Sequence, residues 1–177
     1  MIKRGYIQLF MCSISLLSSV LLVAQPIDLN ITSPLNWEIY VNEQDVPVAG
    51  EDINRTIRSA ADETVIMIEG KPAWWNPNHP NHIKFCEQRG RCDWRVEIER
   101  ADNNWHPELN LQVRRTSGTP NVLEGNLWRP IHPYSVFFFR GTGNAENIHI
   151  QYEIKGLSVT IPADNYSTQI YYTVSDY

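Results

Sequence analysis

Residues 94–99 read Trp-Arg-Val-Glu-Ile-Glu, and this stretch decides the fold class. Its apolar side chains alternate one for one with charged side chains, which is the two-residue period of a β-strand with one buried and one wet face. An amphipathic helix would instead repeat its apolar residues three and four positions apart. The stretch therefore predicts a strand whose Trp, Val and Ile side chains point into a core.

The same period recurs along most of the chain. Two unbroken apolar runs, 65–68 and 136–139, are typical of strands covered on both faces. Clusters of Pro, Gly and Asn separate the runs and indicate turns, so about eight strands are predicted. The other alternating runs lie at residues 27–31, 37–41, 109–113, 148–154 and 167–177.

Helical signals are nearly missing. Only residues 54–62 suggest a short helix or a turn of helix, and helix never alternates with strand often enough to build a parallel sheet. The sequence therefore predicts an all-β fold, a single antiparallel β-sandwich that is immunoglobulin-like or jelly-roll-like. Residues 25–177 fit one such domain, because two separately stable domains would each be small for that length.

Composition and charge narrow the choice of partners. The chain has 177 residues, of which 42% are hydrophobic and 20% charged, and 15 Lys and Arg face 20 Asp and Glu, giving a net charge of -5. These are the proportions of an ordinary globular protein. A negative field repels a phosphate backbone, so we expect no nucleic-acid binding and partners that are neutral or cationic.

Residues 1–24 have the pattern of a secretory signal peptide. Lys3 and Arg4 precede an apolar stretch that ends at Ala24, and we expect cleavage after that residue. The apolar run falls short of the ~20 residues that a spanning helix needs, so the mature chain is predicted to have no transmembrane segment. Without its two leader cations the mature chain, of net charge -7, would be secreted, periplasmic or at the cell surface.

The cysteines agree with export. Cys12 belongs to the leader, which leaves Cys86 and Cys92 as a pair in an oxidising compartment. We predict one disulfide that closes a short hairpin, with Gly90 in its turn. A loop this short gains only about 2 kcal/mol from the bridge, which would shape the hairpin tip rather than hold the whole fold.

The sequence carries no catalytic motif of the common hydrolases, phosphate-binding loops or dinucleotide folds. Glu97 and Glu99 share one strand face with Arg95, where solvated surface charge is the ordinary explanation. His79 and His82 lie close together, but a zinc site or a small hydrolase would need a further ligand or acidic partner. We therefore predict a protein that is not an enzyme, with no catalytic residue, metal or cofactor.

Tryptophan is the more informative residue type, with six in the chain. Trp74 and Trp75 are adjacent in a loop rich in Pro and Asn, and Trp105 follows two asparagines. Flat aromatic rings stack on the apolar faces of sugars, and nearby amides can bind sugar hydroxyls. These three residues are the predicted ligand-binding residues. The remaining three are expected in the core or at a turn: Trp37, Trp94 and Trp128.

The end of the chain carries a family resemblance. Residues 157–174 read Leu-Ser-Val-Thr-Ile-Pro-Ala-Asp-Asn-Tyr-Ser-Thr-Gln-Ile-Tyr-Tyr-Thr-Val. This segment resembles the closing strands of exported β-sandwich proteins, namely spore-coat-U-like and fimbrial subunits and WxL-type surface domains. The resemblance implies a structural role outside the cell. The close, internal cysteine pair differs from many fimbrial subunits, which bridge distant strands, and no functional residue is carried over.

Two functions follow as hypotheses. The first is a structural or adhesive surface protein that associates with a surface or matrix protein, or with itself, through sheet edges or through residues 74–92. In that case residues 25–31 form either the first strand of the domain or a strand that adds to a neighbour's sheet. The alternative is a carbohydrate-binding module that holds a glycan on its loop tryptophans.

Overall fold

The computed structural model describes residues 27–32, 37–41, 56–70, 92–158 and 160–176. Every regular element in these ranges is a β-strand, and none of them holds a helix that could cross a membrane. The strands are β1 (Asp28–Ile31), β2 (Ile57–Arg58), β3 (Thr64–Glu69), β4 (Asp93–Asn104), β5 (Asn110–Arg115), β6 (Val122–Leu123), β7 (Arg129–Pro130), β8 (Val136–Thr142), β9 (Ala145–Lys155) and β10 (Ser167–Asp176).

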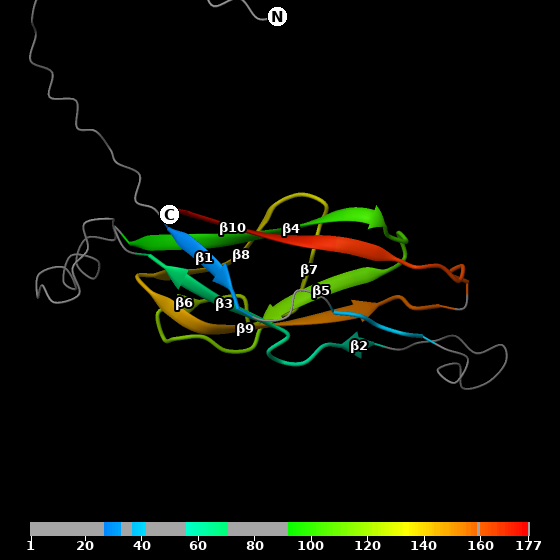
Figure 1. Cartoon of the computed structure of the whole chain (residues 1–177), viewed down its shortest axis with the longest axis horizontal. Coiled ribbons are helices and arrows are strands. Elements are labelled where there is room, and N and C mark those ends of the chain that lie inside the picture. The colour runs from blue at the N-terminus through cyan, green and yellow to red at the C-terminus, as the bar shows by residue number, and fades with distance from the viewer. Residues whose placement is uncertain (1–26, 33–36, 42–55, 71–91, 159, 177) are drawn as a thin grey trace, which may run out of the picture.

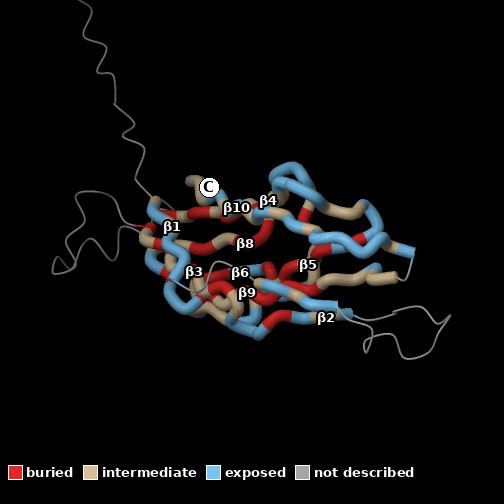
Figure 2. The backbone as a smooth tube through the Cα atoms, turned by 45° about the vertical axis from the view of Figure 1, so that its right-hand side comes forward, coloured by how far each residue is buried: buried red, intermediate tan, exposed pale blue. Residues whose placement is uncertain are grey.

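The strands form two antiparallel sheets that pack face to face (Figure 1). One sheet has the order β1-β3-β9-β5-β7, with β2 also paired to β9, and the other has the order β10-β4-β8-β6. The buried residues lie along the strands of both sheets (Figure 2). The prediction of an all-β antiparallel sandwich is thus confirmed.

The pairing is nested along the chain. β3 pairs with β9, β4 with β8 and β5 with β7, while each strand from β4 to β10 lies in the sheet opposite to the strand before it. This is the order obtained when one long antiparallel hairpin is wrapped around a core, as in a jelly roll. Of the two sandwich types predicted, the pairing favours the jelly roll.

Two of the sequence predictions are wrong. Residues 56–62 form no helix, because Ile57 and Arg58 extend along β9 as β2 and Ser59 donates its backbone N–H to the Tyr152 carbonyl at 3.1 Å. Residues 37–41 form no strand. Trp37 nevertheless packs on the core as expected, with its ring stacked on that of Tyr152 at 6.0 Å.

The indole of Trp94 occupies the end of the core where β3, β4, β8 and β9 come together. The residue is fully buried, and its Nε1 donates a hydrogen bond to the Gly143 carbonyl at 2.7 Å. A Cβ atom on Gly141 would lie 2.5 Å from the Cη2 atom of this ring, and one on Gly70 would lie 2.9 Å from its Cδ1 atom. The ring therefore needs glycine at both positions.

A chain of hydroxyl groups links the two sheets through the core. The Tyr152 hydroxyl on β9 lies 2.8 Å from Thr64 Oγ1 on β3 and 2.8 Å from the Tyr172 hydroxyl on β10. Burial raises the pKa of both tyrosines, so the chain stays neutral and hydrogen-bonded at physiological pH. Each buried hydroxyl thereby has the partner that it needs inside an apolar core.

Replacing Gly141 by Ala tests the Trp94 packing. We expect Gly141→Ala to lower the free energy of unfolding by about 1–3 kcal/mol, because the added methyl group overlaps the indole. Trp94→Phe in the same chain should remove part of that penalty, giving a coupling of at least ~0.5 kcal/mol in a double-mutant cycle measured by urea unfolding. Strictly additive effects of the two changes would show that the indole is not what restricts position 141.

Candidate functional site

The three predicted ligand-binding tryptophans do not come together as a described platform. Trp74 and Trp75 lie outside the described residues. Trp105 is half-buried against the core, and its Nε1 donates to the Leu109 carbonyl at 2.9 Å. The guanidinium of Arg100 lies 5.4 Å from the centre of its ring. The polar edge and one face of Trp105 are therefore engaged within the protein.

The predicted disulfide and the histidine pair also fall largely outside the described residues, as Cys86, His79 and His82 do. Cys92 is buried and directly precedes β4. In the ranges that the structure describes, no three His, Cys, Asp or Glu side chains are grouped so that they could hold a metal ion.

The carboxylates of β4 lie on the outer face of the four-stranded sheet. Glu97 forms an ion pair with Arg95 at 3.2 Å and accepts a hydrogen bond from the Ser135 hydroxyl at 2.9 Å. Glu97 and Glu99 are both partly exposed. Their contacts are those of surface charge, as the alternation indicated.

A larger polar cluster lies on the outer face of the other sheet. Ile148, Ile150 and Tyr152 of β9 point into the core, so the alternate side chains of β9 point away from it. These alternate residues meet side chains from β2, β5 and the segment before β7. We call the cluster the β9 outer face, and it consists of Arg58, Gln112, Arg114, Trp128, Gln151, Glu153 and Lys155.

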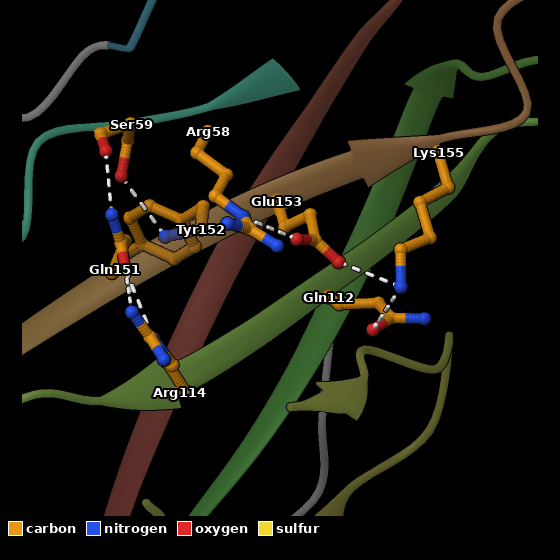
Figure 3. Close-up of polar contacts among 8 residues, drawn as sticks. All are labelled: Arg58, Ser59, Gln112, Arg114, Gln151, Tyr152, Glu153 and Lys155. Carbon is orange, nitrogen blue, oxygen red and sulfur yellow. Dashed lines mark hydrogen bonds and ion pairs between the residues drawn. The ribbon is translucent and has the colours of Figure 1, made fainter. Parts of the chain in front are cut away.

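Glu153 is at the centre of this face, as Figure 3 shows. Arg58 on β2 and Gln112 on β5 lie directly opposite it in the two neighbouring strands. Its carboxylate is 2.6 Å from Arg58 Nε and 2.8 Å from Lys155 Nζ. The carboxylate side chain is 0% exposed, whereas those of Arg58 and Lys155 are 56% and 44% exposed. One buried anion thus holds two cations at the surface.

The ionisation of Glu153 reflects this arrangement. Burial by itself raises the pKa of the carboxyl group, but hydrogen bonds from Lys155 and Arg58, together with their charges, lower the pKa below its ordinary value. The group is therefore ionised at neutral pH. A buried carboxylate in this state is a structural anion and has no proton to supply to a reaction.

Gln151 orders the other half of the face. Its Oε1 accepts two hydrogen bonds from Arg114, from Nε at 3.0 Å and from Nη2 at 2.8 Å. Its Nε2 donates to the Ser59 carbonyl at 2.8 Å, and the Ser59 hydroxyl accepts the Tyr152 backbone N–H at 2.9 Å. These contacts fix the guanidinium of Arg114 over the sheet (Figure 3).

Trp128 joins the two halves. The guanidinium carbons of Arg114 and Arg58 lie 4.7 Å and 5.6 Å from the centre of its ring. Contacts of a guanidinium with an indole ring at these distances are favourable. The face therefore combines one half-buried aromatic ring with three cations and a single carboxylate, which suits it to binding rather than to bond-making chemistry.

Sequence reasoning missed this cluster. The alternation of Gln151, Glu153 and Lys155 is visible in the sequence, but it is the usual pattern of a solvated strand face. Glu153 lies beside the two-residue strand β2, which contributes its partner Arg58. Arg58 precedes Glu153 by 95 positions in the sequence. No pattern in the sequence near Glu153 indicates such a distant partner.

Comparison with known proteins returns no match, since no protein-family model, no curated protein and no solved structure matches the chain. The resemblance of residues 157–174 to exported surface proteins therefore stays a prediction from the sequence. The chemistry of the β9 outer face has to be inferred from its own residues.

Glu153→Gln tests the role of the buried carboxylate. We expect it to lower the free energy of unfolding at pH 7 by roughly 1–3 kcal/mol, because two charge-assisted contacts are lost. A carboxyl whose pKa is lowered by folding stabilises the protein above its ordinary pKa of 4.5, and that stabilisation is lost as pH falls through the folded-state pKa. Urea unfolding from pH 7 to pH 3 should therefore show a weaker acid dependence for Glu153→Gln.

The matched control is Glu108→Gln, an exposed residue in the turn before β5. Its acid dependence should equal that of the parent protein. If Glu153→Gln kept the full acid dependence of the parent, Glu153 would not be the ionised centre of the face.

Proposed function

We propose that the protein is a secreted or cell-surface β-sandwich with a structural or adhesive role and no enzymatic activity. The observation that carries the proposal is the open edge of the four-stranded sheet. β10 is an outermost strand of this sheet, and it pairs along its full length with β4. No other described strand pairs with its free side.

The sequence of β10 makes this edge unusual. Natural proteins protect long edge strands with charged residues, proline or bulges, since a bare edge invites another strand. Residues 167–175 contain no charged residue and no proline. Ile170, Tyr172 and Val174 pack against the core, while Tyr171 is 46% exposed on the outer side. An uncharged edge of this length, the first nine of the ten residues of β10, is suited to pairing with another strand.

The first strand is less suited to leave its own domain. β1 pairs antiparallel with β3, with Leu29 opposite Ile68 and Ile31 opposite Ile66. Ile27 and Leu29 pack against the core. This supports the simpler of the two predictions for residues 25–31, in which they form a strand of the same domain, and it favours β10 as the edge that associates.

A carbohydrate-binding module remains the second candidate. Its predicted residues Trp74 and Trp75 lie outside the described part of the chain, but Trp128 supplies an aromatic ring within a polar surface. A glycan array probed with the full secreted protein and with a Trp74→Ala, Trp75→Ala double variant distinguishes the candidates. Selective binding that the double variant loses would favour the module.

Export and the disulfide are part of the proposal. We expect the secreted protein to begin at Gln25 and its intact mass to fall short of the reduced chain by two hydrogen atoms, from a bond between Cys86 and Cys92. Intact-mass spectrometry before and after reduction measures both. Uptake of alkylating reagent on both cysteines without prior reduction would exclude the bond. A mass that still includes residues 1–24 would exclude cleavage.

The edge is tested by placing charges on it. Gln169 and Thr173 are exposed neighbours of Tyr171, and a Gln169→Lys, Thr173→Lys variant adds two cations to the strand. We expect the parent protein to self-associate with rising concentration in sedimentation velocity and the variant to remain monomeric, because like charges on adjoining edges repel.

The control places the same pair of charges away from the edge, by Asn126→Lys and Asn144→Lys, two exposed loop residues. Equal association of parent, edge variant and control would count against β10 as the contact. The edge proposal would be contradicted if the parent protein stays monomeric at all concentrations and no strand of another protein pairs with β10.

A further inference from the structure

We propose that the β9 outer face binds an acidic polysaccharide, through the guanidinium groups of Arg58 and Arg114 beside the ring of Trp128. This surface lies on the six-stranded sheet, whereas the β10 edge belongs to the four-stranded sheet. The inference rests on charge and geometry at the β9 outer face and is independent of self-association through β10.

The first argument is a local excess of positive charge. Glu153 is the single carboxylate of the β9 outer face, against the three cations Arg58, Arg114 and Lys155. By contrast, Arg95 pairs with Glu97 and Arg100 pairs with Asp102, one cation with one carboxylate in each case. The face is thus locally cationic on a chain whose net charge is -5.

The second argument concerns the hydrogen-bonding groups that remain. Arg58 contacts Glu153 through Nε, and Arg114 uses Nε and Nη2 on Gln151. Within the described residues, the Nη atoms of Arg58 and Nη1 of Arg114 make no hydrogen bond. Guanidinium N–H groups bind carboxylate and sulfate oxygens in pairs, so these groups can receive an anion from solvent.

The third argument is that the cations are already held in place. Glu153 fixes Arg58, Gln151 fixes Arg114, and the indole of Trp128 lies against both guanidinium groups. A ligand therefore does not have to order these long side chains on binding. Such preorganisation raises affinity by reducing the conformational entropy that binding would otherwise cost.

The combination of an aromatic ring with guanidinium groups fits a charged sugar. An acidic sugar can place its carboxylate or sulfate on a guanidinium group while the C–H groups of its ring lie beside the indole that holds both guanidinium groups. Duplex DNA, with one charge per ~1.7 Å, would meet stronger repulsion from the acidic remainder of the chain than a polymer whose charges are spaced further apart. An acidic polysaccharide is therefore the better match.

The test is binding of the full secreted protein to polygalacturonate, dextran sulfate and neutral dextran, by affinity electrophoresis and calorimetry. We expect one or both charged polymers to bind, neutral dextran not to bind, and binding to weaken from about 0.05 M to about 0.5 M salt as charge is screened. If only polygalacturonate binds, the carboxylate is the preferred group. If only dextran sulfate binds, the sulfate is preferred.

Arg114→Gln should weaken binding by about tenfold or more, because one charge-assisted pair is lost. The matched control Arg95→Gln, on the other sheet, should bind as the parent does. Arg114→Lys keeps the charge without the planar fork and should bind with intermediate affinity, which tests the site even if Arg114→Gln folds poorly. Thermal unfolding of each variant establishes that it is folded.

Several results would overturn the inference. These are an equal loss of binding in Arg95→Gln and Arg114→Gln, no binding of either charged polymer by the folded protein, or, in the same assays, duplex DNA bound as tightly as the polysaccharides. The Gln169→Lys, Thr173→Lys variant separates the two proposals, because it should lose self-association and keep polysaccharide binding.

Discussion

The sandwich depends on how one large ring, that of Trp94, is accommodated between its sheets. The indole is fully buried, and glycine at positions 70 and 141 makes room for it on two sides. Its one polar atom bonds the Gly143 carbonyl in the turn between β8 and β9. Because that turn connects the two sheets, the same side chain sets both the depth of the core and the position where β9 begins. A core of this density tolerates little change in volume.

Much of the fold could be predicted because its long strands have a strict period. The alternation around Trp94 and along β9 and β10 reports one buried face, and the structure has strands there. The strands β2, β6 and β7 have two residues each, too few to show any period, so they were not predicted. The residues 37–41 alternate without forming a strand. The β9 outer face was missed for a further reason. The burial of Glu153 depends on residues that are distant in the sequence, and the local pattern does not indicate them.

The two surfaces singled out differ in their physical basis. The β10 edge offers backbone hydrogen bonds along residues 167–175, which carry no charge, a contact that salt affects little. The β9 outer face offers fixed cations held by a buried carboxylate and an amide, a contact that salt weakens. Because each surface belongs to a different sheet, association through one leaves the other accessible. The two proposals are therefore compatible, because a protein built in this way can associate through one sheet and bind a ligand on the other.

The nested pairing also governs when the chain can fold during its synthesis. β3 finds its partner at β9, where Thr64 meets Ile150, and β4 finds its partners at β8 and β10. Few contacts can therefore form before the C-terminal third has been made, and topologies dominated by such distant contacts fold slowly. Ribosomes add roughly 5–20 residues per second, so β3 and β4 wait for seconds until β8, β9 and β10 are made, although β1 can already pair with β3. Under the export proposed above, this late pairing would leave the chain without a finished core while it crosses a narrow translocation channel.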